Sequence, residues 1–190
     1  MATGSSDSRR KRPRSVRPRV SVLRVGHRVG RDPRLTTHLA LAARALGAER
    51  MFLEPADPEI ADRVAALARG WGGSFAVEGV ADWKAVVRSF PGRVVHLTMY
   101  GETLEKALPR LRGTPRVLLV VGGAKVPPDL YRLAHLNLAV GSQPHSEVAA
   151  VAVVLDRLLG GPARTRFPGG RRRVVPQVRG KKVLVRSRRA

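Results

Sequence analysis

The residues best suited to chemistry in this chain lie in three short segments, each directly after an apolar run. They are HLTMYG (96–101), GGAKVP (122–127) and VGSQPHSE (140–147). Ligands of open α/β sheets bind beyond the carboxyl ends of the strands, so polar groups there predict a small-molecule pocket. Gly122 and Gly123 lack a Cβ, which lets backbone N–H and C=O groups approach a ligand closely. The competing interpretation of 142–147 is a helix start, with Pro144 in the first turn and Glu147 in a capping role.

The loop after the first apolar run is too long and too basic to be a nucleotide-binding turn of the Rossmann type. Its first residues, GHRVG (26–30), depart from GxGxxG. The loop as a whole contains Arg28, Arg31 and Arg34. The sequence also has no GxxxxGK[ST] segment, which removes the usual phosphoryl-transfer interpretation. The loop therefore predicts a contact with a phosphate of the substrate rather than a cofactor cradle.

The net charge of +22 is concentrated at the two ends of the chain. Residues 1–34 carry 11 Lys/Arg and 2 Asp/Glu, residues 164–190 carry 11 and none, and the 129 residues between them carry 14 and 12. This asymmetry indicates a polyanionic partner, although basic tails or a genomic bias toward Arg would also produce it. Because few aromatic residues accompany the Arg, we expect backbone and shape recognition of a folded RNA rather than base stacking.

Several classes of protein are disfavoured by composition. No apolar run approaches the roughly 18–20 residues that span a bilayer, and the first residues have no apolar segment typical of a signal peptide. We therefore expect a cytoplasmic protein without membrane contact. The chain has no Cys, and its five His residues lack metal-ligand spacing, so we expect no metal.

Apolar, β-branched runs alternate with helical patterns, which predicts a parallel α/β sheet. The predicted strands are Val20–Val25, Met51–Leu53, Ser74–Val77, Val94–Leu97, Val117–Val121 and Leu136–Val140. The predicted helices run from a cap at Thr36-Thr37 to Gly47, from Pro58 to Gly70, and over Asp82–Phe90, Thr103–Arg112, Asp129–His135 and Pro144–Leu159. Pro109 is expected to break or kink the fourth helix.

Three regions follow from these patterns. Residues 1–19 are predicted to be a disordered basic extension, and residues 20–162 a single folded domain. Residues 163–190 form a basic tail that either pairs as a hairpin around Arg179-Gly180 or stays extended.

Five blocks, in order, resemble one known family. They are VLRVGHRVGRDPRLTTHLALAARALGA (22–48), RGWGG (69–73), VHLTMYG (95–101), VVGGAKVP (120–127) and NLAVGSQPHSEVAAVAVVLDRL (137–158). Together they are similar to the archaeal tRNA (cytidine(56)-2'-O)-methyltransferases of the SPOUT superfamily. The resemblance runs from about Val20 to Lys182 and leaves out the basic N-terminal extension.

The resemblance implies a SPOUT-type parallel sheet with helices on both faces and a C-terminal trefoil knot, which periodicity alone would not have predicted. It also implies a homodimer that methylates the ribose of cytidine 56 in the T-loop of tRNA, with S-adenosyl-L-methionine as methyl donor. The residues that would hold this cofactor are Leu97, Gly122, Gly123, Ala124, Lys125, Val126, Val140, Gly141, Ser142, Gln143, Pro144, His145, Ser146 and Glu147.

In related ribose methyltransferases an arginine of the first motif acts near the 2'-hydroxyl. The candidates here are Arg28, Arg24, Arg31 and Arg34. We rank Arg28 first, because it lies just past the first strand in a glycine-flanked loop and would stay protonated to fix a phosphate and polarise the hydroxyl. Proton abstraction would fall to His38, His145 or water. The arginine that the wider superfamily has shortly before the end of the first helix corresponds to Leu41, so the catalytic arginine does not transfer by position.

Two alternatives remain at this point. One is a SPOUT 2'-O-methyltransferase that acts on a different RNA. The other is a non-catalytic basic RNA-binding protein that uses its two polycationic ends.

Overall fold

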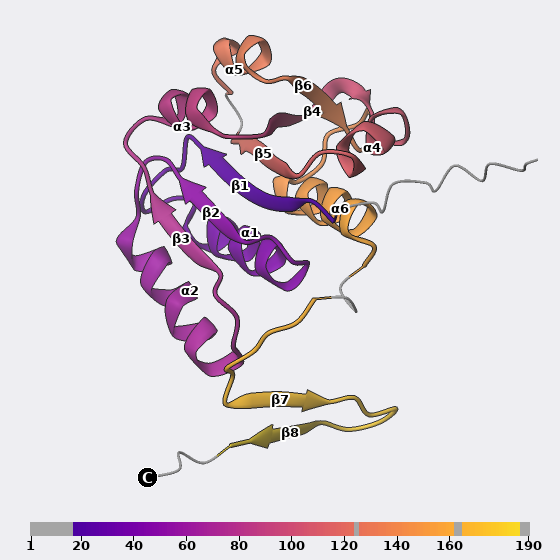
Figure 1. Ribbon diagram of the computed structural model, residues 1–190. Helices are drawn as coiled ribbons and strands as arrows, with labels where there is room; N and C mark the ends of the chain where they lie inside the picture. Colours follow the sequence, from indigo (N-terminus) through magenta and orange to yellow (C-terminus); the bar gives the residue numbers. More distant parts are fainter. Residues whose placement is uncertain (1–16, 124–125, 162–164, 187–190) are drawn as a thin grey trace, which may run out of the picture.

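The computed structural model describes residues 17–123, 126–161 and 165–186. Within them, a six-stranded parallel sheet has the order β3-β2-β1-β5-β4-β6, and a two-stranded antiparallel hairpin extends from the body (Figure 1). The strands of the sheet are β1 (Arg19–Val25), β2 (Arg50–Leu53), β3 (Ala76–Gly79), β4 (Arg93–Thr103), β5 (Arg116–Gly122) and β6 (Leu136–Ala139). The helices are α1 (Pro33–Ala45), α2 (Pro58–Trp71), α3 (Trp83–Ser89), α4 (Leu104–Arg112), α5 (Pro128–Leu133) and α6 (Glu147–Leu159). The hairpin is formed by β7 (Arg172–Val175) and β8 (Lys182–Val185).

Helices cover both faces of the sheet. α1, α2, α4 and α6 lie on one face, where Leu39, Ile60 and Leu155 join the larger apolar core. α3 and α5 lie on the other face, and Trp83 and Leu130 belong to the smaller core there. Strands between two helical layers are buried on both sides, which explains why residues 117–121 of β5 form a continuous apolar run and why even Ser21 and Arg24 of β1 are buried. The predicted parallel α/β sheet with helices on both faces is confirmed.

All six predicted strands and six predicted helices are present, but two helix starts were wrong. α1 begins at Pro33 and not after Thr36-Thr37, because the fixed φ of proline suits the first helical position. α6 begins at Glu147 and not at Pro144. There the Oγ of Ser146 accepts a hydrogen bond from the N–H of Ala149 at 3.1 Å and satisfies a donor of the first turn.

Two other elements differ from their predicted form. α4 continues through Pro109 without a break, and its buried Leu104, Ala107 and Leu111 hold it on the core. β4 extends to Thr103 rather than ending near Leu97. Packing of an apolar stripe outweighs the local cost of proline in the first case.

The C-terminal segment is attached to the body beside the end of α2. A Cβ on Gly72, whose φ is +83°, would lie 2.5 Å from the carbonyl oxygen of Phe167 and 2.6 Å from the nitrogen of Gly170. The N–H of Gly73 donates to the carbonyl of Pro168 at 2.8 Å. The RGWGG segment (69–73) is therefore glycine-rich because residues 167–170 pass directly against it. From there the hairpin, one of the two forms expected for this tail, projects beyond the body (Figure 1).

The strand order brings the candidate loops to one edge. Chain progression runs from β1 outward through β2 to β3, whereas β5, β4 and β6 lie on the other side of β1. The carboxyl ends of β1, β5, β4 and β6 are thus consecutive, and the direction of progression changes between β1 and β5. Such a switch point is where ligands bind in open α/β sheets.

Candidate active site

The three loops singled out by sequence meet at this edge, because β4 lies between β5 and β6. The first loop is a bulge in β4: Leu97 and Glu102 both pair with Leu138, so residues 98–101 leave the ladder between them. The loop after β6 is solvent-exposed over 141–146 and ends at the start of α6. The three segments therefore follow neighbouring strands of the sheet, as the sequence predicted.

Backbone approaches closely in this region, as a ligand held by main-chain groups requires. A Cβ on Gly101 would lie 2.4 Å from the backbone of Leu138, and a Cβ on Gly122 would lie 2.7 Å from the side chain of Val126. On Gly123 a Cβ would come no nearer than 3.8 Å, to the carbonyl oxygen of Gly26 after β1. The end of β5 is therefore packed against the loop after β1, and the missing Cβ of Gly122 makes room for Val126. Ala124 and Lys125 lie outside the described residues.

Asp32, the residue before α1, organises the arginine-rich loop after β1. Its Oδ2 accepts hydrogen bonds from the backbone N–H and the Nε–H of Arg28 at 3.2 and 3.0 Å, and its Oδ1 accepts one from Nη2 at 2.8 Å. The hydrogen bonds and charge of Arg28 lower the pKa of Asp32 to about 2. The carboxylate therefore stays ionised and closes the loop as a ring from residue 28 to residue 32.

Arg24 connects this loop to the start of α6. Its side chain is 1% exposed, and its guanidinium lies 3.5 Å from Asp32 and 3.4 Å from Glu147, measured between the nearest nitrogen and oxygen. A buried cation needs compensating charge, and here one carboxylate directly precedes α1 and the other belongs to the first residue of α6. Arg24 thus ties the basic loop to the helix that follows the third candidate segment.

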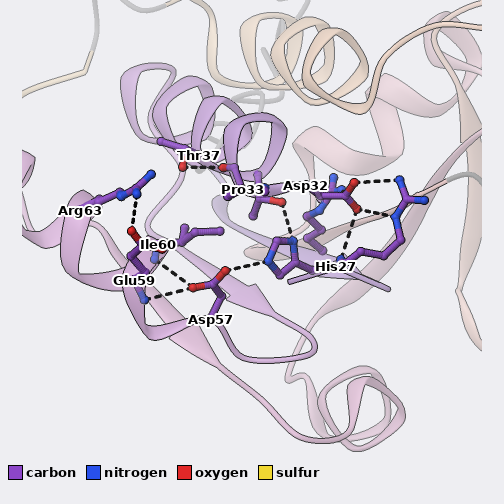
Figure 2. A network of polar contacts seen from close by, with 11 residues as sticks. His27, Asp32, Pro33, Thr37, Asp57, Glu59, Ile60 and Arg63 are labelled. Carbon is purple, nitrogen blue, oxygen red and sulfur yellow. Dashed lines mark hydrogen bonds and ion pairs between the residues drawn. The ribbon is translucent and has the colours of Figure 1, made fainter. Parts of the chain in front are cut away.

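A second polar network fixes the same loop from the opposite side (Figure 2). The buried His27 ring lies between Thr36 Oγ1, 2.9 Å from its Nδ1, and Asp57 Oδ2, 3.0 Å from its Nε2. Asp57 also accepts from the N–H groups of Glu59 and Ile60 at the start of α2, and its hydrogen bond with His27 is the main cause of its lowered pKa. Both ring nitrogens of His27 lie within hydrogen-bond distance of neighbouring side chains, so this histidine anchors the loop.

The predicted catalytic residues occupy different environments. Arg24 is completely buried, whereas the Arg28 side chain is 55% exposed and held by Asp32. Arg31, Arg34 and His38 are exposed, and the described residues contain no ion-pair partner for them. Those three side chains are therefore accessible to a large ligand, whereas Arg24 is enclosed by protein.

His96 lies directly before the β4 bulge and is buried. Its Nδ1 is 2.9 Å from the Oδ1 of Asn137, and the ring meets that of Tyr131 edge-on at 4.6 Å. Burial lowers the pKa of His96, and the bond to Asn137 opposes this only in part. A neutral His96 therefore supports the loop from beneath.

Comparison with known proteins shows the family of this chain. The model of the family described as tRNA ribose 2'-O-methyltransferase, aTrm56, matches residues 71–184. The tRNA (cytidine(56)-2'-O)-methyltransferase of Cenarchaeum symbiosum is 50% identical over 169 residues, which cover 87% of this chain and 97% of that protein. The enzyme of that description from Methanothrix thermoacetophila is 47% identical over 172 residues, 89% of this chain and 99% of its own. The chain belongs to the aTrm56 family. The resemblance seen in the five sequence blocks is confirmed.

Solved structures of other methyltransferases have the same fold as this chain. An RNA 2'-O ribose methyltransferase superposes with a TM-score of 0.58 at 16% identity, covering 82% of this chain and 61% of the other. The SpoU methyltransferase AviRb from Streptomyces viridochromogenes, in complex with AdoMet, has a TM-score of 0.56 at 14% identity and covers 79% and 60% of the two chains. This chain thus spans about three fifths of the length of those proteins and shares their SPOUT architecture.

Sequence reasoning missed the two aspartates that organise the basic loop of this aTrm56 chain. Asp32 had a visible signal, since it is the single acidic residue among Arg24, Arg28, Arg31 and Arg34 and directly precedes a proline. Asp57 had a weaker one, a helix cap before Pro58. Neither signal indicated which distant side chain would be bound.

Among the described residues, no three His, Cys, Asp or Glu side chains come together to hold a metal ion. No helix in the same part of the chain is long and apolar enough to cross a membrane.

Proposed function

We propose that this protein transfers a methyl group from S-adenosyl-L-methionine to the ribose 2'-hydroxyl of cytidine 56 in the T-loop of tRNA. The observation that carries the proposal is the convergence of the loops after β4, β5 and β6 beside the arginine-rich loop after β1. In this proposal the edge supplies both the cofactor site and a basic contact for RNA.

The cofactor residues are those expected from sequence: Leu97, Gly122–Val126 and Val140–Glu147. Leu97 is a buried member of the larger core at the start of the β4 bulge, and the exposed 141–146 segment would form another wall of the site. When bound, S-adenosyl-L-methionine supplies a methyl group on a sulfonium, which is already a strong electrophile. The protein's main task is therefore to align the acceptor.

Arginines of the basic loop would perform that alignment. Arg28 uses Nε and Nη2 to bind Asp32, which leaves Nη1 for a phosphate, whereas Arg31 and Arg34 are exposed without an ion-pair partner in the described residues. A guanidinium matches the oxygens of a phosphate with two parallel donors. We assign Arg31 and Arg34 to the RNA backbone, Arg28 to the loop and the acceptor ribose, and Arg24 to positioning.

We expect one of three acceptors to take the 2'-hydroxyl proton: His38 on α1, His145 after β6, or solvent. His38 and His145 are both exposed, whereas His27 and His96 have their Nδ1 atoms bound to neighbouring side chains. His38 and His145 are thus the side chains to test as general bases.

Three further features belong to the proposal. The chain forms a homodimer in which each site lies near the subunit interface, α6 is part of a trefoil knot, and the enzyme acts in the cytoplasm. Residues 1–16 of the predicted basic extension lie outside the described residues. The absence of a metal requirement is likewise part of the proposal.

The deciding experiment compares labelled methyl transfer to a tRNA transcript and to the same tRNA with 2'-deoxycytidine at position 56. We expect label in the first and none in the second, because the second lacks the acceptor oxygen. Equal labelling would show that a different nucleotide is methylated. Calorimetry with S-adenosylhomocysteine should find one site per chain, and no binding would instead favour a non-catalytic RNA-binding protein.

A further inference from the structure

Arg44 is a buried cation on the last turn of α1, at the edge of the sheet opposite the candidate active site. The residue is 8% exposed. Its Nη2 donates to the carbonyl oxygen of Gly72 at 2.5 Å, and its guanidinium lies 4.6 Å from the centroid of the Phe167 ring. Its Nε is buried and has no hydrogen-bond partner in the described part of the chain.

No carboxylate in the described residues neutralises Arg44. Glu49, the nearest acidic residue in sequence, is ion-paired with Arg19, and Glu78 is paired with Arg50 at 2.9 Å. Burial lowers the pKa of Arg44, as expected for a cation that has lost water without gaining a counterion. An uncompensated buried charge with an unused donor is costly unless an anion completes it.

The surroundings of Arg44 are hollow and basic. A cavity of about 330 Å³ is lined by Arg19, Arg44, Glu49, Arg50, Arg166 and Phe167 among others. Arg166 is exposed, and the described residues contain no ion-pair partner for it. Two of the four arginines are therefore left with unbalanced charge beside this cavity.

A second cavity of about 190 Å³ lies next to the first. It shares Arg19, Glu49 and Arg50 with it and adds Arg116, which is paired in register with Arg19 across β1 and β5. Arginines begin four neighbouring strands along this edge, β2, β1, β5 and β4. A row of this kind suits a chain of phosphates better than a single small anion.

We propose that the cavity around Arg44 and Arg166 binds a phosphate group of an RNA backbone, remote from the nucleotide that is methylated. The inference rests on the proposed function for the identity of the RNA as tRNA. β1 has seven residues, so the cavity lies about 20 Å from the loop that carries Arg28, a distance that the arms of a folded tRNA easily span. The site adds affinity through charge and does not read sequence.

Arg166→Glu is the direct test, because the side chain is exposed and its replacement leaves the Arg44 contacts in place. Arg88→Glu is the matched control: it makes the same charge change at an exposed α3 residue on the other face of the sheet. We expect Arg166→Glu to weaken tRNA binding about ten-fold more than the control. It should also reduce the slope of log Kobs against log salt by about one, the signature of a lost phosphate contact.

Arg44→Met provides a second test with a readout that a purely structural role would not produce. If Arg44 only holds the C-terminal segment, the variant lowers stability and leaves the salt slope unchanged. If it binds phosphate, the slope falls as it does for Arg166→Glu. Inorganic phosphate should raise the melting temperature of the wild-type protein. The rise should be smaller for Arg44→Met and for Arg166→Glu.

The outcomes distinguish free phosphate from RNA phosphate as the ligand. They also distinguish failure of this site from failure of the proposed methyl transfer. If phosphate stabilises the protein but both variants bind tRNA like the control, the cavity takes a free anion and the RNA assignment is overturned. If neither phosphate nor tRNA distinguishes the variants from the control, the site itself is refuted. If tRNA is not methylated yet its binding depends on Arg166, the proposed function fails and this site stands.

Discussion

Replacing Asp32 by Asn should destabilise the protein by about 2 kcal/mol at neutral pH, with a loss that shrinks in acid. Asn has nearly the same shape as Asp but carries no charge, so it tests the carboxylate rather than packing. The variant removes the charge to which Arg28 donates three hydrogen bonds and leaves Arg24 with Glu147 alone.

The magnitude follows from two contributions. The pKa of Asp32 lies at about 2 rather than 3.8, chiefly because of the hydrogen bond from Arg28. Without solvent screening, a pKa difference of this size corresponds to about 2 kcal/mol of unfolding free energy. The Arg28 side chain is 55% exposed, so screening reduces this contribution to about 1 kcal/mol. The attraction of Arg24 at 3.5 Å is already part of this shift, but leaving that buried cation with Glu147 alone adds a desolvation cost of about 1 kcal/mol.

The pH dependence has a definite sign. A carboxylate with a lowered folded-state pKa stabilises the protein fully above its unfolded value of 3.8, and this stabilisation is lost as pH falls through about 2. Urea unfolding of both proteins at pH 7, 5, 4 and 3, followed by circular dichroism, should therefore show the difference narrowing below pH 4. Asp129→Asn is the control, since its partner Lys84 is on the surface and a smaller effect is expected. A difference that stays constant from pH 7 to 3 would refute the electrostatic account.

Three more outcomes are expected. Gly72→Ala should detach the C-terminal segment and open new cleavage sites between residues 165 and 186 in limited proteolysis, whereas Gly30→Ala, which also has positive φ but an empty surrounding, should not. Arg31→Ala and Arg34→Ala should each lower kcat/KM for tRNA about ten-fold with little change in the dissociation constant for S-adenosylhomocysteine. If the affinity for S-adenosylhomocysteine fell as much as kcat/KM, a role in RNA contact would be contradicted. His96 should titrate below 6.5 in NMR, so any stability linked to it is complete above pH 6.5 and is lost as pH falls; an ordinary or raised pKa would show that the ring is hydrated.

Local rules predicted the elements of this fold more accurately than their ends. Runs such as 117–121 are buried on both faces, so an apolar pattern was sufficient to identify them as strands. The start of α6 was misplaced because Pro144 and Ser146 both suit a helix start, and the choice depends on which hydrogen bonds the finished loop makes. The β4 bulge had no signal in sequence, since it exists only through pairing with β6.

The sequence by itself determined the alternation of strands and helices, the concentration of charge at the ends, the three polar loops and the family. These properties depend on composition, periodicity and short motifs, which are local. Tertiary structure alone decided that Arg24 is buried between Asp32 and Glu147 and that Arg28 is held while Arg31 and Arg34 are exposed. It also decided that Arg44 is buried with no carboxylate partner among the described residues. Whether an arginine is a structural tie, a substrate contact or an unsatisfied charge depends on which carboxylates come within about 4 Å of it, and only the packing of distant segments sets that distance.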